Sequence, residues 1–523
     1  MGGVLNEAVF CIEITMKKNR RFKRKYGGQM IRGALLMTGA GILCKLIGML
    51  HRIWLGNILG AGGVGRYQLA YSVYGVLLTA VSGGIPQAVA ALTAGSLAKG
   101  DTLSAVQRFY AVRRWMCGLG LAGAAVLIVC GECLAGWMGI PGDGRILQAA
   151  APAVLFTALT AAYRGYAQGK QAVFPYAAAQ VCEQAVKLAA GIWLAAKWME
   201  RGEGWGAVGA MTGVSISEFC GLLVMGLWTG KVRGRSEKGM FSRYIAQLTK
   251  LSLPVTMGMA VLPILGSIDG VLCIRLLQRY AEGDSTALYG LYSGFVMPVM
   301  HLPGVIASAV SVCALPAVAS AVAEGRQERL HNRLSISIRV ICMAGLPLVI
   351  GMWLLAEPLL AALYRGLSAQ ELQTGEYLMR LAAPGVFLAM LAQVSGTLLQ
   401  GLGRMSRPAV NMAVGAACRL LTEWLLIPRM GIGGAAIGGV VCFAVPAALN
   451  MWAVKRRGNG SYPLSKCLLQ PLLAGIWMAG GMAAVWQLMG SGGVWGMLCA
   501  GVAGTGIYVG SLWLMHALPL REI

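Results

Sequence analysis

Two basic residues, Lys45 and Arg52, interrupt a long apolar stretch near the start of the chain. With Gly41 and Gly48 they share one face of a helix, and the two charges lie about 10 Å apart. Such a pair could bind an anionic group. A charge held at mid-membrane costs at least about 2.5–3.5 kcal/mol, so this face is expected to turn toward water or protein. The alternative is that Arg52 snorkels to the headgroups while Lys45 meets a carbonyl or an acidic neighbour.

Two further charged pairs lie four residues apart inside apolar stretches. Glu183 precedes Lys187, and Arg419 precedes Glu423, so the signs are reversed. One interpretation is that each is a within-helix ion pair that offsets its own burial. The other is that Lys187 and Arg419 donate to a bound anion while the two carboxylates hold them in place.

A third charged stretch contains Asp269 and Arg275 and is preceded by Pro254 and Pro263. Broken helices are common at transporter sites, so it is a candidate gate; the alternative places Arg275 at the outer interface. The predicted substrate-binding residues are therefore Lys45, Arg52, Lys187, Arg275 and Arg419. The predicted supporting or coupling residues are Glu183, Asp269, Glu423 and Gln87, and weaker candidates for lining a cavity are Glu218, His301, Arg339, Gln393 and Gln400.

No catalytic motif accompanies these charges in the sequence. It contains no GxxxxGK[ST] phosphate loop, no HExxH, and no Ser/His/Asp or Cys/His arrangement. The 14 cysteines are scattered, and the one close pair, Cys130 and Cys133, has no second pair beside it. We therefore expect no enzymatic activity, no cofactor and no metal site.

The composition is that of a membrane protein. Of 523 residues, 57% are hydrophobic and only 12% are charged, which predicts an all-α polytopic membrane protein. The net charge of +24 lies mostly in short loops, and no nucleic-acid-binding motif is present, so no nucleic-acid partner is expected. Fourteen spans are predicted, at about 31–58, 66–94, 115–137, 147–167, 172–197, 206–229, 249–278, 287–321, 334–356, 377–400, 408–428, 431–454, 467–489 and 493–517.

The eighth predicted span is too long for one straight helix. It contains Pro298, Pro303 and Pro316, which are expected to kink or split it. The first and second spans are expected to meet at a turn over Leu59–Gly63.

Basic residues crowd alternate predicted connections, which predicts that both termini lie in the cytoplasm. One such connection is assigned Arg164 and Lys170, and another contains five basic residues between 231 and 243. The first 29 residues contain a dense basic run, Lys17–Lys25, that could lie on anionic lipid; a wrongly assigned start codon is the alternative.

Four short sequence matches recur in the same order, about 225–235 residues apart, for example Ala80–Pro86 with Ala309–Pro316. Six spans fit within this offset, which predicts two parallel repeats with a site between them. The expected organisation is a basic cytoplasmic tail (1–29), a six-helix lobe (30–230), a basic cytoplasmic linker (231–250), a second six-helix lobe (251–457) and two additional helices (458–523).

Six stretches of the sequence resemble those of a known protein family: Ile31–Leu36, Lys45–Gly48, Leu59–Tyr67, Gly84–Ala90, Gln180–Lys187 and Met297–Pro303. They resemble the stage V sporulation protein B family of polysaccharide-biosynthesis membrane proteins. That family belongs to the multidrug/oligosaccharidyl-lipid/polysaccharide exporter superfamily and is related to the lipid II flippases. The resemblance covers about Met30 to the C-terminus.

The resemblance implies two six-helix lobes around a central cavity, and alternating access that moves undecaprenyl-pyrophosphate-linked sugars outward. In lipid II flippases, basic residues of the first helix are associated with the pyrophosphate, and Lys45 and Arg52 lie in that region. The flippase pattern of Arg followed by Arg-Asp is replaced here by Lys45 and His51-Arg52. The implied partners are an anionic lipid-linked saccharide, membrane lipids and, as candidates, cell-wall synthesis enzymes. The resemblance also implies that the protein is a monomer in the bacterial cytoplasmic (plasma) membrane.

Three other functions stay open at this point. A cation-coupled drug exporter of the same superfamily would want unpaired carboxylates in the first lobe, where the first four spans offer only Glu132. A membrane-embedded glycan ligase would need a large loop or a catalytic carboxylate at the surface. A non-transporting scaffold in spore or cell-wall assembly is the third. The last two helices could accommodate a lipid tail or serve packing alone.

Overall fold

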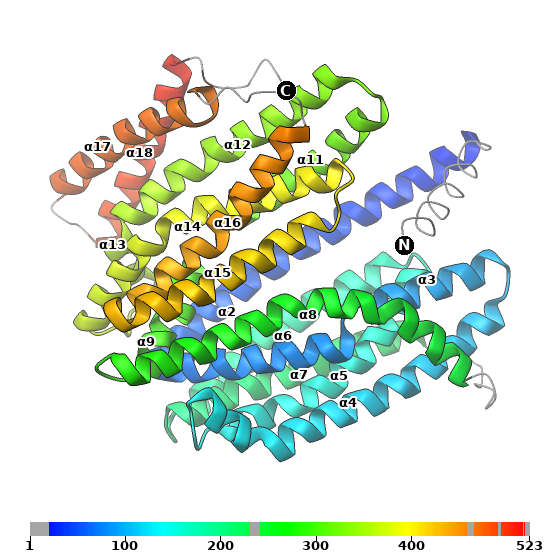
Figure 1. The fold of residues 1–523 in the computed structure, drawn as a ribbon. Helices are drawn as coiled ribbons and strands as arrows, with labels where there is room; N and C mark the ends of the chain where they lie inside the picture. Colours follow the sequence, from blue (N-terminus) through cyan, green and yellow to red (C-terminus); the bar gives the residue numbers. More distant parts are fainter. Residues whose placement is uncertain (1–19, 231–240, 458–464, 490–492, 516, 518–523) are drawn as a thin grey trace.

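The computed structural model describes residues 20–230, 241–457, 465–489, 493–515 and 517 (Figure 1). Within these residues every regular element is a helix, which confirms the predicted all-α class. The first 19 residues of the predicted tail, and Lys231, Arg233, Arg235 and Lys238 of the predicted linker, lie outside the described residues.

The first half begins with one long element, α2 (Arg20–Ser82), which is kinked at Gly60. Gly60 has φ +65° and ψ −178°, a conformation that only glycine adopts readily. The kink lies within the predicted Leu59–Gly63 turn, so the boundary between the first two spans is confirmed. The other helices of this half are α3 (Ile85–Ala98), α4 (Thr102–Met138), α5 (Gly144–Gly169), α6 (Val173–Met199) and α7 (Glu203–Thr229).

The second half opens with α8 (Phe241–Tyr280), which continues through both Pro254 and Pro263. The predicted eighth span is indeed split. It forms α9 (Ser285–Gly290), a π-helical segment (Leu291–Val296) and α10 (Met297–Met300), then breaks over 301–303 before α11 (Gly304–Ala323). The break follows from Pro303, whose ring cannot continue the preceding helix, whereas α11 runs on through Pro316.

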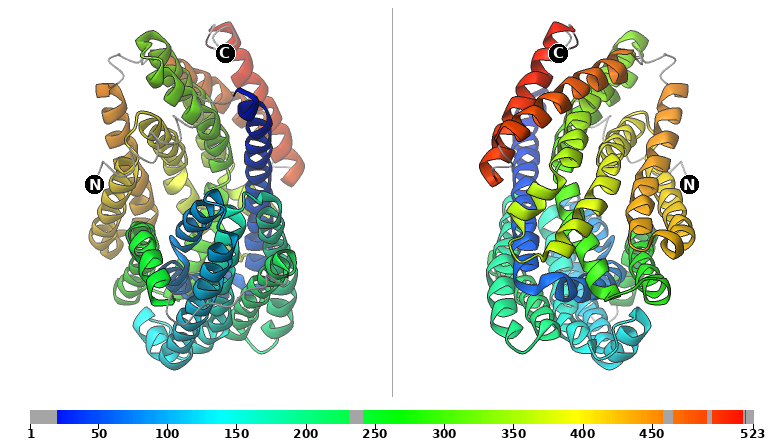
Figure 2. Two further views of the ribbon diagram at one scale, coloured as in Figure 1. Left: turned by 90° about the vertical axis from the view of Figure 1, so that its right-hand side faces the viewer. Right: turned by 90° about the vertical axis from the view of Figure 1, so that its left-hand side faces the viewer.

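The remaining helices complete the second half and the C-terminal pair. They are α12 (Gln327–Leu354), α13 (Ala356–Leu363), α14 (Ala369–Gly401), α15 (Arg407–Met430), α16 (Gly433–Arg457), α17 (Gln470–Leu488) and α18 (Gly493–Leu514). Figure 2 shows α17 and α18 at the edge of the molecule, where α17 packs on α12 and α18 packs on α13.

Twelve helices in the described part of the chain are long and apolar enough to cross a membrane. That count treats α2 and α3 as one segment, although α2 is kinked at Gly60 and ends at Ser82, and it leaves out α6, which contains Glu183 and Lys187. The exact number of fourteen therefore stays a prediction, as does the proposed division into two lobes at the 231–250 linker.

The two halves meet most closely at the end of the molecule where α2 kinks. There α2 packs against α9 and the π-helical segment, with backbone touching backbone. A Cβ atom added to Gly65 would overlap the carbonyl oxygen of Thr286, and one added to Gly290 would overlap that of Ala61. This end of the interface is therefore closed by glycines that admit no side chain.

Candidate functional site

A cavity of about 490 Å³ lies between the two halves. We call it the cationic cavity, because Lys45, Arg52 and Lys187 all line it; α2 and α6 form one wall and α10, α11 and α14 form the other. Lys45, Gly48 and Arg52 lie along the same wall, as their helical spacing predicts. The Lys45 ammonium crosses the cavity to donate to the Ser308 hydroxyl at 2.9 Å. Three of the five predicted basic residues thus converge.

Lys187 reaches the cavity through an aromatic wall. Its ammonium lies 4.6 Å from the centre of the Tyr71 ring and donates to the Tyr71 hydroxyl at 3.3 Å. Tyr67 stacks on Tyr71 with the ring centres 5.7 Å apart and also lines the cavity. The ring faces stabilise the ammonium electrostatically without neutralising it, so the charge remains available to an anion.

The predicted ion pair between Glu183 and Lys187 is wrong. Glu183 is buried and accepts from the Arg164 guanidinium of α5, with both carboxylate oxygens 2.5 Å from Nη2. Arg164 is predicted to lie in a loop, but it lies inside α5 with 19% of its side chain exposed. A guanidinium matches a carboxylate better than an ammonium one turn away on the same helix. Lys187 is therefore left to the cavity.

Arg419 is not brought to the cationic cavity. Its predicted pairing with Glu423 is confirmed at 2.9 Å, and it also meets Asp269 of α8 at 2.5 Å. Glu423 is fully buried, and only 18% of the Arg419 side chain is exposed. One guanidinium between two carboxylates is a closed ionic cluster, so its geometry does not support the predicted contact of Arg419 with substrate.

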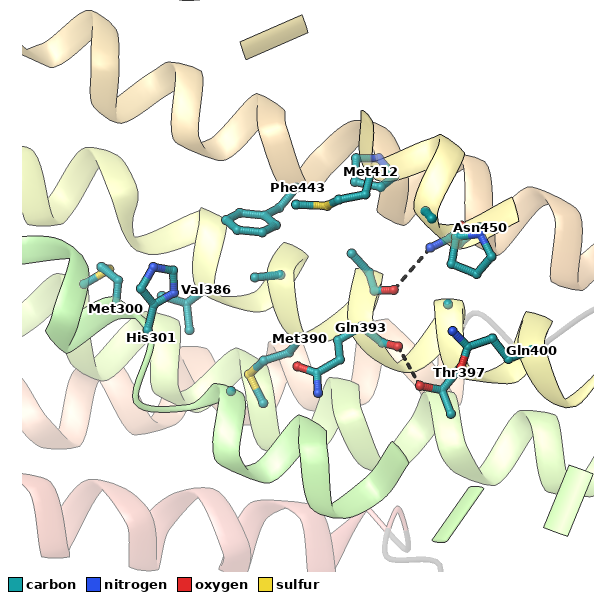
Figure 3. A pocket seen from close by; sticks show the side chains of 17 residues that line it. Met300, His301, Val386, Met390, Gln393, Thr397, Gln400, Met412, Phe443 and Asn450 are labelled. Carbon is teal, nitrogen blue, oxygen red and sulfur yellow. Dashed lines mark hydrogen bonds between the residues drawn. The ribbon is translucent and has the colours of Figure 1, made fainter. Parts of the chain in front are cut away.

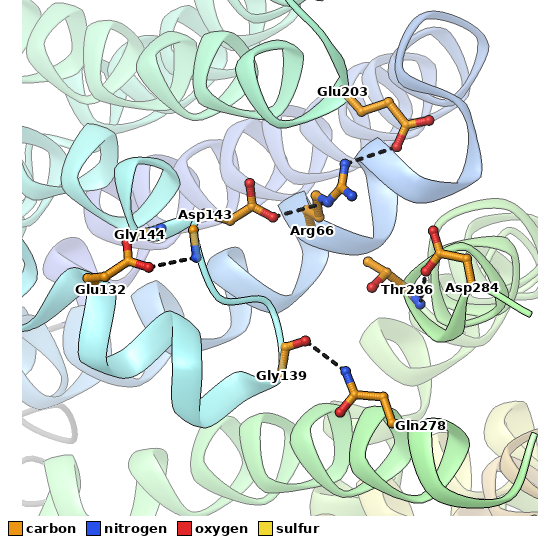
Figure 4. Close-up of polar contacts among 10 residues, drawn as sticks. Arg66, Glu132, Gly139, Asp143, Gly144, Glu203, Gln278, Asp284 and Thr286 are labelled. Carbon is orange, nitrogen blue, oxygen red and sulfur yellow. Dashed lines mark hydrogen bonds and ion pairs between the residues drawn. The ribbon is translucent and has the colours of Figure 1, made fainter.

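Arg275 also lies away from the cavity. Its guanidinium donates to the carbonyl oxygens of Gly136 and Trp137, at 2.8 and 3.0 Å, and so stabilises the C-terminal end of α4. Gln278 makes a similar contact with Gly139 (Figure 4). These bonds join α8 to the first half of the chain.

Three other candidates are placed elsewhere. Gln87 is exposed on α3 and lines none of the three cavities described here. Glu218 accepts from Thr157 at 2.8 Å, and Arg339 is buried and donates to the Ala517 carbonyl.

A polar network at the closed end of the molecule was not predicted from the sequence. Arg66 of α2 pairs there with Asp143 at 3.1 Å and with Glu203 at 3.0 Å (Figure 4). Asp143 precedes α5 and Glu203 begins α7, so a single guanidinium joins three segments. Arg66 is one of the residues on which the family resemblance rests, but its partners are distant in the sequence.

A second cavity, of about 570 Å³, adjoins the first inside the second half (Figure 3). We call it the amide chamber after its polar lining residues Gln393, Gln400 and Asn450. Gln393, Thr397 and Gln400 follow one face of α14 at intervals of four and three residues. The predicted lining roles of His301, Gln393 and Gln400 are confirmed, whereas the roles of Thr397 and Asn450 were missed. The α14 periodicity could have revealed Thr397.

A third cavity, of about 620 Å³, is bounded by α11, α12, α17 and α18. We call it the apolar groove, because leucine and methionine are the commonest residues in its lining; Leu302, Leu348, Met478 and Met482 are examples. It gives the C-terminal pair of helices a face on a cavity as well as a packing role.

The broken segment between α10 and α11 is a common wall of all three cavities. His301 and Gly304 line both the cationic cavity and the amide chamber, and Leu302 lines both the cationic cavity and the apolar groove. α11 begins at Gly304, so the positive end of its dipole lies at this wall. Three compartments of different chemistry thus meet at one break in a helix.

These features define a multi-pass membrane protein with a transporter fold. A model of the polysaccharide biosynthesis protein family matches residues 30–322, more than half of the chain, and a MatE model matches residues 254–425. The chain belongs to the polysaccharide biosynthesis protein family.

Relatives and solved structures agree with this placement. The chain is 24% identical to stage V sporulation protein B of Bacillus subtilis (strain 168), covering 82% of this chain and 83% of that protein. It is 22% identical to the lipid II flippase MurJ of the same organism, covering 83% and 84%.

The structure of a lipid II flippase MurJ in an inward closed conformation matches with a TM-score of 0.74 at 12% identity, over 92% of this chain and 99% of that one. An inward-facing MATE family transporter of the MOP superfamily matches with a TM-score of 0.64 at 15% identity, over 80% and 94%. The family resemblance and the two-repeat fold that it implies are thereby confirmed.

Proposed function

We propose that this protein is a flippase that moves an anionic, lipid-linked saccharide across the bacterial cytoplasmic membrane by alternating access. The observation that carries the proposal is the convergence of Lys45, Arg52 and Lys187 on one cavity between the halves. On the surface of a soluble protein three such charges would be well hydrated. Inside a membrane protein each one carries a desolvation cost, so three in one cavity indicate a polar or charged ligand.

The electrostatics of the cavity favour a phosphate-containing ligand. At about 4 Å, and at an effective dielectric constant of about 20, one unit charge attracts another by about 4 kcal/mol. Glu183, the carboxylate one turn from Lys187, is held by Arg164, so it does not compete for that ammonium. A pyrophosphate linkage, such as that of an undecaprenyl-linked sugar, has the charge and the compact shape for this site.

The neighbouring apolar groove supports a lipid as the other part of the ligand. It shares Leu302 with the cationic cavity, so a chain attached to the phosphate could pass directly into it. In this proposal the last two helices, α17 and α18, accommodate the lipid tail, which is one of the two roles that the sequence left open.

The family relatives point the same way. The B. subtilis MurJ protein is described as a lipid II flippase, and lipid II or a related cell-wall precursor is accordingly the proposed cargo. With both termini in the cytoplasm, the end closed by Gly65 and Gly290 faces outward.

The alternatives find less support in the geometry. A cation-coupled drug exporter would need a carboxylate in the cavity, and the 17 described residues that line it include none. A ligase that acted on a lipid bound in this cavity would need a catalytic carboxylate beside it, and the same described lining residues include none. A scaffold in spore or cell-wall assembly leaves the three basic residues without a role.

The test is transport of a labelled undecaprenyl-pyrophosphoryl disaccharide in vesicles that contain the purified protein. We expect exposure of the label on the far leaflet to require the protein. A charge-assisted hydrogen bond contributes about 1.5–3 kcal/mol, so Lys45→Gln and Arg52→Gln are each expected to slow transport at least tenfold. Arg114→Gln is the matched control, because Arg114 is exposed on α4 and lines none of the three cavities. Equal exposure with and without the protein would reject the proposal.

A further inference from the structure

We propose that the amide chamber is the subsite for the saccharide of the cargo, and that it selects uncharged sugars over acidic ones. This inference rests on the proposed function, since it assigns the part of the ligand that the cationic cavity and the apolar groove leave unassigned. It makes the substrate class narrower: a lipid-linked glycan whose first sugars carry no net charge.

The lining of the chamber has the chemistry of a sugar site. Amide side chains both donate and accept hydrogen bonds, as sugar hydroxyls do. Gln400 projects into the chamber, and the Thr397 hydroxyl, which donates to the Gln393 carbonyl at 3.0 Å, keeps its lone pairs for a ligand (Figure 3). Phe443 and Met412 supply apolar surface for the C–H faces of a sugar ring.

Asn450 is a rigid part of this wall. It is buried, donates to the Ala392 carbonyl at 3.2 Å and accepts from Asn411 at 2.7 Å. These bonds fix α16 against α14 and α15, so the polar groups of the chamber are held in place before a ligand arrives.

The chamber disfavours the charged parts of the ligand, because its described lining contains no charged side chain. None of the 17 described residues that line it is a carboxylate, a lysine or an arginine. A phosphate there would lose its counter-ions, and an acidic sugar would bring a charge into a site with no cation to receive it. The pyrophosphate is therefore favoured in the cationic cavity and the neutral sugars in the chamber.

The arrangement of the cavities matches the order of groups in the ligand. In a lipid-linked saccharide the phosphates lie between the sugar and the lipid. The cationic cavity likewise shares His301, Gly304 and Gln393 with the amide chamber on one side and Leu302 with the apolar groove on the other. The chamber volume of about 570 Å³ lies within the range of sites that enclose small ligands, which suits a headgroup of a few sugars.

The experiment compares three lipids for binding to the full-length protein in nanodiscs. They are undecaprenyl pyrophosphate without sugar, the same lipid with a neutral disaccharide, and the same lipid with a disaccharide containing a uronic acid. One or two well-formed hydrogen bonds are worth about tenfold in affinity. We therefore expect the neutral saccharide to tighten binding about tenfold over the sugarless lipid, and the acidic one to give no such gain.

The chamber is tested with the double variant Thr397→Val/Gln400→Leu. We expect it to remove the gain from the neutral saccharide and to leave the Kd of the sugarless lipid unchanged, which also shows that the variant is folded. The matched control is Thr422→Val/Gln370→Leu. Thr422 donates to the carbonyl four residues before it, as Thr397 does, but neither control residue lines the chamber.

The inference is overturned if the neutral disaccharide adds no affinity, if the gain survives in the chamber variant, or if that variant weakens the sugarless lipid equally. The proposed function fails in a different way. Lys45→Gln/Arg52→Gln is expected to weaken all three lipids, and a variant that binds them all as the native protein does would reject the cationic cavity. The ratio between sugar-bearing and sugarless lipids would still decide the role of the chamber.

Discussion

The two halves of the molecule treat corresponding charged pairs in opposite ways. In the first half, Glu183 of α6 is paired with Arg164 of the preceding helix, α5, and Lys187 is left facing the cationic cavity. In the second half, Arg419 is held by both Glu423 and Asp269 and lines none of the three cavities. The same four-residue spacing therefore yields a cavity-facing cation in one repeat and a closed ionic cluster in the other.

This difference explains why the space between the halves is chemically one-sided. The first half contributes all three basic residues that line the cationic cavity, while the second half contributes His301 and Gln393 to it and encloses the uncharged amide chamber. The two repeats have similar frames, and the helix partner of each charged residue determines which repeat presents charge to the cavity. Three substitutions test this contrast.

The largest effect is expected for Arg419→Ala, which leaves two carboxylates buried without their shared cation. Breaking a buried ion pair from one side costs about 3–5 kcal/mol, so we expect a large fall in the thermal midpoint of the purified protein. The triple variant Arg419→Met/Asp269→Asn/Glu423→Gln removes all the charges together and is expected to recover much of the loss. A single variant as stable as the native protein would contradict the closed cluster.

An intermediate effect is expected for Glu183→Gln. It leaves the Arg164 guanidinium, which is mostly buried, with a neutral partner, at a cost of about 1.5–3 kcal/mol. The thermal midpoint measures this loss, and Glu200→Gln, at the exposed end of α6, serves as the control. If Lys187 rather than Arg164 were the true partner, Lys187→Met would destabilise the protein by a similar amount and Arg164→Met would not.

The smallest effect on stability is expected for Lys187→Met, less than about 1 kcal/mol, because its partner is the Tyr71 ring and hydroxyl rather than a carboxylate. Its effect should instead fall on the ligand, with binding of undecaprenyl pyrophosphate weakened about tenfold. Unchanged binding together with strong destabilisation would make Lys187 a structural residue like Arg419.

Much of the fold could be predicted from hydrophobic runs and from breakers. The turn at Gly60 and the split of the eighth span follow from glycine and proline, whose effects are local. The shared face of Lys45 and Arg52 was equally predictable, because helical periodicity alone determines it.

The pairing of charges between helices could not be predicted in the same way. Arg164 lies near the end of an apolar run and resembled a loop residue, so its pairing with Glu183 depended on how α5 and α6 are placed side by side. Asp269 and Arg419 are 150 positions apart in the sequence. Periodicity identifies which residues share a face of one helix, but only tertiary packing determines which face of another helix they meet.

The glycine contacts at Gly65 and Gly290 have a consequence for how such a protein would avoid leaks. Peptide groups that meet directly have no long side chains to stretch or slide, so the seal they form fits in one register only. A small tilt of one half relative to the other would therefore either keep the whole backbone contact or break it. A partly open contact that conducts water or protons is not expected. A bulkier residue at Gly65 or Gly290 would hold the two backbones apart, so the closed end is expected to leak.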